Sequence, residues 1–162
     1  MRIVSWNLGY AFSFRRRHDQ AWHYLAALDP DIALLQEALP PAWARERWKI
    51  EFRPIREWGT AIVAKPWLKV RSDPESVAYS ATGTVSLSDG TDLLVASVHT
   101  QVGVPSPQDY AGLDHEAIRR PRRASLSHAD VAYAIQRRRV EGGRFLVGGD
   151  WNTARLWDRT HP

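Results

Sequence analysis

The chain contains the stretch Asp31-Ile32-Ala33-Leu34-Leu35-Gln36-Glu37, a short apolar run that ends in a carboxylate. Three other runs have the same form: Arg2–Trp6 leads into Asn7, Leu93–Val98 leads into His99, and Phe145–Gly149 leads into Asp150. Runs of this length, bounded by turn residues, predict β-strands. Because four separate strands end in Asn, Glu, His and Asp, we expect their ends to assemble one polar site.

The segments between these runs predict helices and hairpins. His18–Leu28 has apolar residues at helical spacing, Asp29–Asp31 is a turn, and Ser88–Thr91 is a hairpin signal. We further expect a strand over 2–8 that is buried on both faces, a short helical turn near Trp43–Trp48, strands over Ile50–Phe52, Gly59–Ala64, Thr82–Leu87 and Leu93–His99, and a second helix over Ser125–Val140. This order predicts a layered α/β or α+β sandwich.

Length and composition limit the class of protein. The 162 residues are expected to form one domain over 1–162, with 44% hydrophobic and 25% charged residues, as in ordinary globular proteins. There is no cysteine, which excludes a disulfide framework, a thiol nucleophile and a thiolate zinc site. The eight tryptophans can serve as core side chains or as base-stacking surfaces, and the core is the plainer interpretation.

The charge and the absence of apolar segments bear on partners and location. A net charge of +4 and a pI of about 9.8 favour an anionic partner. Nearly all positive charge is arginine, which suits phosphate but is equally explained by a genome base-composition bias. No run reaches membrane-spanning length and no leader precedes the first strand, so a cytoplasmic location is expected. Nothing indicates the oligomeric state.

The segment after the last apolar run is the most suggestive chemically. Asp150 and Asn152 are two apart, so in extended backbone they share a face while Trp151 points to the other. Gly148-Gly149 before them allows close approach of backbone or ligand. The carboxylate can orient or deprotonate water and the amide can hold a phosphate oxygen. A turn in which both side chains bond only backbone fits the pattern as well.

Three more strand ends add candidate ligands. Glu37 follows apolar residues, where an unpaired charge is costly and a bound Mg²⁺ removes the cost. His99 can donate to a phosphate oxygen or act as an acid, and Asn7 can bind the metal or order a carboxylate. Taken singly, Glu37 and His99 are more often ordinary strand-end residues, and Asn7 is equally a plain turn residue. Together they indicate hydrolysis of a phosphate ester with a divalent metal.

Five segments in order resemble the endonuclease/exonuclease/phosphatase superfamily. They are Trp6-Asn7-Leu8, Leu35-Gln36-Glu37, Gly59–Val63, Val98-His99-Thr100 and Gly149–Thr153. The resemblance spans essentially the whole chain, and the family includes deoxyribonucleases, apurinic-site endonucleases, sphingomyelinases and inositol-polyphosphate phosphatases. It implies a four-layer α/β sandwich: two facing mixed β-sheets flanked by helices, with the site at one rim.

The resemblance also implies a role for each residue. Glu37 would be the principal ligand of Mg²⁺ or Mn²⁺, with Asn7 beside it. His99 would contact the scissile phosphate, Asp150 would orient or activate the attacking water, and Asn152 would hold a phosphate oxygen. The implied substrate is a phosphodiester or phosphomonoester, with DNA and RNA among the candidates.

One part of the family pattern has no counterpart. The pattern ends with a Ser-Asp-His segment well beyond Gly-Asp-x-Asn, whereas this sequence ends ten residues after Asn152, at Pro162. Asp158 and His161 are the nearest candidates, and they are not adjacent. We therefore expect the C-terminal strands of the family fold to be missing, which would leave a sheet edge unpaired.

The arginine clusters and the rival hypotheses remain open. The cluster Arg119, Arg120, Arg122 and Arg123 lies in a loop that the resemblance places beside the site, and it either grips substrate phosphates or is solvated surface. The leading hypothesis is a metal-dependent phosphoester hydrolase, such as a nuclease. The alternatives are a catalytically impaired phosphate- or nucleic-acid-binding relic of the same fold, and an unrelated sandwich with coincidental polar strand ends.

Overall fold

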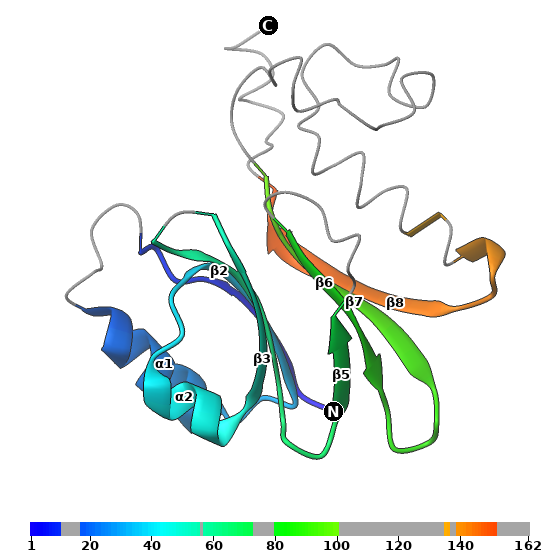
Figure 1. The fold of residues 1–162 in the computed structure, drawn as a ribbon, viewed down its shortest axis with the longest axis horizontal. Coiled ribbons are helices and arrows are strands. Elements are labelled where there is room, and N and C mark those ends of the chain that lie inside the picture. Colours follow the sequence, from blue (N-terminus) through cyan, green and yellow to red (C-terminus); the bar gives the residue numbers. More distant parts are fainter. Residues whose placement is uncertain (11–16, 56, 73–79, 101–134, 137–138, 152–162) are drawn as a thin grey trace, which may run out of the picture.

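The computed structural model describes residues 1–10, 17–55, 57–72, 80–100, 135–136 and 139–151. Within them, eight strands form two sheets, and two helices are described in full (Figure 1). In chain order the elements are β1 (Ile3–Asn7), α1 (His18–Leu28), β2 (Ile32–Ala38), α2 (Ala42–Arg47), β3 (Lys49–Pro54), β4 (Gly59–Ala64), β5 (Lys69–Ser72), β6 (Ser80–Ser86), β7 (Asp92–His99) and β8 (Arg144–Asp150).

Strand β2 is buried along its whole length because it lies inside the first sheet and is covered on both faces. The order of this sheet is β1-β2-β4-β3, with β1 parallel and β4 antiparallel to β2. A strand covered on both faces requires a continuous apolar run, and Ile32–Leu35 is such a run.

The second sheet has β7 inside it, in the order β5-β6-β7-β8. Strands β6 and β7 form the hairpin that Ser88–Thr91 predicts, with Leu87 N–H donating to Thr91 O at 2.8 Å and Gly90 at a φ of 80°. Strand β8 pairs with β7 in parallel, so both sheets are mixed. This is the two-sheet α/β sandwich that the sequence predicts.

Three apolar clusters define the layers. Helices α1 and α2 pack on the face of the first sheet that is turned away from the second sheet (Figure 1), through Trp22, Leu25 and Ala44. Between the sheets, side chains such as Leu34, Ile62 and Val95 make the second cluster. On the far face of the second sheet, Ala96 and Val98 pack with Ile135, Val147 and Trp151. Residues 135–136 and 139–140 are helical there; the remainder of the helix predicted over Ser125–Val140 lies outside the described residues.

Most predicted elements are confirmed, with two corrections. Strand β5 was not predicted, because Lys69–Ser72 is a mostly exposed edge strand without an apolar pattern. The prediction that the first strand is buried on both faces is wrong: Ile3 is 42% exposed and Ser5 is exposed, since β1 is the edge of its sheet. Within the described residues, no helix has the length and apolar character needed to cross a membrane.

Candidate active site

Four polar strand ends meet at one rim of the sandwich. Because β1 is parallel to β2 and β8 is parallel to β7, each pair delivers its carboxyl ends to the same edge of its sheet. Backbone bonds continue both pairs past their ends: Leu8 N–H donates to Gln36 O at 2.8 Å, and Thr100 N–H donates to Asp150 O at 2.9 Å. Residues separated by more than a hundred positions in sequence therefore become neighbours.

A β-bulge aims Glu37 into this rim. Strand alternation would place Glu37 on the helix-covered face with Ala33 and Leu35. The pairing of β2 with β4 shifts by one residue between Leu35 and Ala38, and Glu37 has a φ of 47°. A non-glycine residue in this region is uncommon, and such outliers are typical of functional sites. The bulge turns the Glu37 carboxylate toward the second sheet, where it is only 4% exposed.

Asn7 joins the two carboxylates. Its Nδ2 donates to Glu37 Oε1 at 3.2 Å and to Asp150 Oδ2 at 2.8 Å, the second bond linking one sheet to the other. Its Oδ1 accepts from Gly9 N–H at 2.8 Å, which orients the amide. Because the Nδ2 group faces both carboxylates, Asn7 orders them in this arrangement. To serve as a ligand of a cation between the carboxylates, the Asn7 amide would have to turn so that Oδ1 faces them.

His99 completes the cluster from β7. Its Nε2 lies 3.5 Å from Glu37 Oε1, and its Nδ1 is buried without a hydrogen-bond partner in the described part of the chain. One ligand atom from each of Glu37, His99 and Asp150 lies within 4.8 Å of the other two. Two carboxylates and an imidazole so close together suit a divalent cation, which favours oxygen and nitrogen donors.

The two glycines before Asp150 permit this close assembly. A Cβ on Gly149, whose φ is 159°, would lie 2.0 Å from Val98 O. A Cβ on Gly148 would lie 2.9 Å from Leu34 Cδ1 and 3.1 Å from Ser5 Oγ. The two glycines thus allow atoms of β7, β2 and β1 to approach β8 closely, and β8 packs against the first sheet.

Trp58 is a site neighbour that the sequence did not reveal. It lies just before β4, and its ring contacts His99 edge-on, with centroids 5.2 Å apart. Its position directly before the Gly59 strand, at the end of the sheet where Glu37 emerges, is the signal that could have identified it. The imidazole of His99 therefore contacts the Trp58 indole and also lies beside the Glu37 carboxylate, and these two neighbours restrict its rotation.

The other predicted site residues lie outside the described part of the chain. These are Asn152 and the cluster Arg119, Arg120, Arg122 and Arg123. Asp150 and Trp151 do point to opposite faces as predicted: Asp150 contacts Asn7 between the sheets, and Trp151 packs on the far face of the second sheet.

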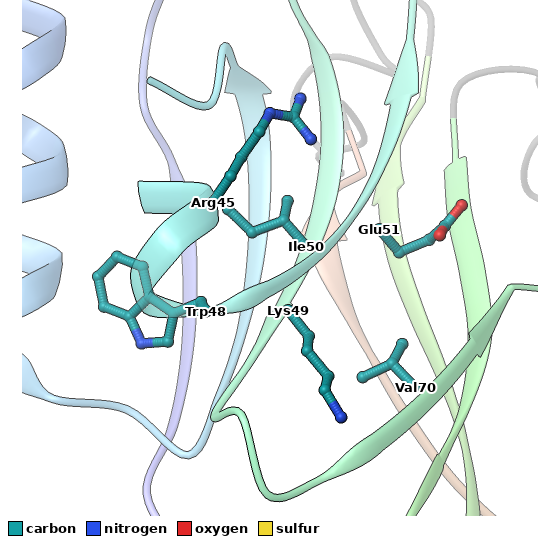
Figure 2. Close-up of a pocket in the computed structure, with 6 residues that line it drawn as sticks. All are labelled: Arg45, Trp48, Lys49, Ile50, Glu51 and Val70. Atoms are coloured by element: carbon teal, nitrogen blue, oxygen red, sulfur yellow. The ribbon is translucent and has the colours of Figure 1, made fainter. Parts of the chain in front are cut away.

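A hollow with a volume of about 420 Å³ is separate from this cluster. It is lined by Arg45, Trp48, Lys49, Ile50, Glu51 and Val70 (Figure 2). Strand β3, which supplies three of these residues, is the edge of its sheet opposite β1, so none of the four clustered side chains contributes to the hollow. Because both basic and acidic side chains line the hollow, its charge favours neither an anionic nor a cationic ligand.

The fold has counterparts among solved structures. Truncated Caenorhabditis elegans TDP2 is 18% identical with a TM-score of 0.59, over 93% of this chain and 62% of that chain. Humanized D. rerio TDP2 is 16% identical with a TM-score of 0.58, over 99% of this chain and 65% of the other. The endonuclease domain of TRAS1, a telomere-specific non-LTR retrotransposon, is 15% identical with a TM-score of 0.59, over 96% and 61%.

This chain therefore spans less than two thirds of the length of each of these structures, and the likeness to them is one of fold. No curated protein matches the sequence significantly. The family model described as the endonuclease/exonuclease/phosphatase family matches residues 4–162. The chain belongs to the endonuclease/exonuclease/phosphatase family.

Proposed function

We propose that this protein hydrolyses phosphate esters with a divalent metal ion, Mg²⁺ or Mn²⁺, and that Glu37 is the principal metal ligand with Asn7 beside it. The observation that carries the proposal is the meeting of Asn7, Glu37, His99 and Asp150, which come from four strands of two sheets. The membership of the chain in a family of nucleases and phosphatases supports the same reaction class.

The donor set fits a metal ion. Glu37 is 4% exposed and lies within 4.8 Å of a second carboxylate, an arrangement that is costly without a compensating charge. The Asn7 amide offsets part of this cost by donating to both carboxylates. Mg²⁺ prefers oxygen ligands and takes one or two protein carboxylates. When bound, such an ion supplies polarisation of the phosphate and stabilisation of charge on the leaving oxygen.

The side chains of this protein supply the remaining chemistry. Asp150, held by the Asn7 amide at 2.8 Å, would orient or deprotonate the attacking water. His99, which contacts Trp58 and lies beside Glu37, would donate to a phosphate oxygen. Asn152 follows Asp150 by two residues, and we assign it a second phosphate oxygen on the strength of the sequence pattern alone.

Nucleic acid is the substrate class that the charge favours. The net charge is +4, and nearly all of the positively charged side chains are arginines. Arginine presents a planar guanidinium group that matches the geometry of phosphate. We assign phosphate contact to Arg119, Arg120, Arg122 and Arg123. Among the similar structures, one is D. rerio TDP2 complexed with a single-strand DNA product, which shows that a protein of this fold accommodates DNA.

Hydrolysis of bis-p-nitrophenyl phosphate and of plasmid DNA, with Mg²⁺ or with EDTA, tests the proposal. We expect turnover with Mg²⁺, none with EDTA, and a loss of at least about 100-fold in Asp150→Asn, since an acid–base group typically contributes that much. Glu46→Gln, a charge removal on an exposed face of α2, is the matched control and should retain the activity of the parent. DNA binding without turnover in the parent would instead identify the non-catalytic relic.

A further inference from the structure

Gln36 and Ser97 form a polar contact in the apolar interface between the sheets. Gln36 Nε2 donates to Ser97 Oγ at 2.9 Å, and Ser97 Oγ donates to Leu35 O at 2.9 Å. Gln36 is 1% exposed and Ser97 is fully buried. Leu34 and Val95, which precede Gln36 and Ser97 by two residues on their strands, belong to the apolar cluster between the sheets.

This contact adds little to stability compared with an apolar pair. A buried hydrogen bond contributes on the order of 1 kcal/mol net, and replacing both partners by apolar groups of similar shape is close to neutral. A satisfied buried network does specify one arrangement of the groups around it, because any other arrangement leaves polar atoms unpaired. The position of Gln36 and Ser97 in the chain shows which arrangement they specify.

Both residues adjoin the strand ends that form the site. Gln36 immediately precedes Glu37, and Ser97 precedes His99 by two residues on the same face of β7. The Leu35 carbonyl that accepts from Ser97 lies at the start of the bulge that turns Glu37 toward the second sheet. The hydrogen bonds thus tie the bulge of β2 to β7 just behind the pair Glu37–His99, whose side chains are 3.5 Å apart.

We propose that Gln36 and Ser97 are positioning residues, which hold the Glu37 bulge against β7 so that the Glu37 carboxylate stays at the metal site beside His99 and Asp150. This inference rests on the proposed function, because it assigns the pair to the same metal site. Partners behind a metal ligand typically contribute a factor of about 10 to 100 in metal affinity.

Mn²⁺ titration calorimetry, together with melting temperatures measured in EDTA, tests the inference on the parent and on Gln36→Leu, Ser97→Ala and the double variant. Ser97→Ala leaves the buried Gln36 amide without its acceptor and should melt at a lower temperature. Gln36→Leu leaves Ser97 Oγ donating to Leu35 O, so it should melt closer to the parent. The double variant should regain most of the stability that Ser97→Ala loses and still bind Mn²⁺ about 10-fold or more weakly. If Gln36 and Ser97 had only a structural role, the variants would show the same changes in melting temperature, but their affinity for Mn²⁺ would equal that of the parent.

Thr82→Val is the matched control. Thr82 is buried on β6 opposite Ala96, away from the bulge, and within the described residues its hydroxyl has no hydrogen-bond partner, so its removal should leave Mn²⁺ affinity unchanged. A parent that binds Mn²⁺ and a double variant that binds it equally well would overturn this inference and leave the proposed function intact. A parent that binds no Mn²⁺ would overturn both. If the double variant fails to fold, Ser97→Ala, which removes a single oxygen atom, carries the same comparison.

Discussion

Glu37→Gln should stabilise the metal-free protein and abolish its stabilisation by metal. Carboxylate oxygens of Glu37 and Asp150 lie within 4.8 Å of each other. At an effective dielectric constant of about 20, two unit charges at that separation repel by about 3 kcal/mol. The Asn7 amide, which donates to both carboxylates, and the nearby His99 offset part of this repulsion. We therefore expect Glu37→Gln to gain about 1 kcal/mol without metal, a rise in Tm of roughly 2–4 °C for a domain of this size.

The same substitution should reverse the order of stability when metal is present. At a Mn²⁺ concentration about 100 times its Kd, the parent should gain about 2.7 kcal/mol from binding, or roughly 5–10 °C in Tm. Glu37→Gln should show little of this gain, because its neutral amide is a much weaker ligand for Mn²⁺. The parent should therefore melt below Glu37→Gln in EDTA and above it in Mn²⁺.

Thermal melts followed by circular dichroism at pH 8, in EDTA and in Mn²⁺, measure both effects. Glu46→Gln removes the same charge from an exposed face of α2 and should keep the metal response of the parent. The reasoning is refuted if Glu37→Gln melts below the parent in EDTA, or if it retains the full Mn²⁺-induced shift.

Three further outcomes follow from other parts of the molecule. Burial lowers the pKa of His18 below its ordinary 6.5, and the hydrogen bond with the Leu39 backbone opposes this shift only in part. The contribution of His18 to stability is therefore full above pH 6.5 and is lost as the pH falls through the lowered pKa of the folded state. Urea unfolding from pH 8 to 5 should show this loss of stability, and His18→Gln should flatten the pH dependence whereas His23→Gln should not. Gly149→Ala should lower the unfolding free energy by at least about 2 kcal/mol, because its Cβ would lie 2.0 Å from Val98 O; unchanged urea stability would contradict this. Replacing the four arginines of residues 119–123 by alanine should flatten the salt dependence of DNA binding, and an equal slope would make them only solvated surface.

The sequence predicts the fold well where one strand or helix has one simple pattern. The continuous apolar run of β2 and the helical spacing of α1 both identify their elements, because burial on two faces and burial on one stripe leave distinct periodicities. Strand β5 has no such pattern, since an edge strand needs only backbone pairing on one side. Burial of β1 was overestimated because a strand's place at a sheet edge is set by partners distant in sequence.

The sequence predicts which strand ends meet but not the geometry of their meeting. Four apolar runs ending in polar residues indicate Asn7, Glu37, His99 and Asp150, and the structure brings them together. The bulge that redirects Glu37 is not visible in the sequence, because alternation alone would place that side chain toward the helices. The sequence also does not reveal Trp58, because its contact with His99 depends on how the two sheets pack face to face.

The central claim is that these strand ends form a metal site, and the anomalous diffraction of crystals soaked in Mn²⁺ tests it most directly. We expect an anomalous peak at the rim, at roughly 2.0–2.3 Å from a Glu37 carboxylate oxygen, a distance typical of small divalent ions bound to oxygen. The peak should be absent from Glu37→Gln crystals soaked in the same way. No peak at this rim in the parent, or a peak found instead beside the surface carboxylates Asp29 and Asp31, would contradict the account.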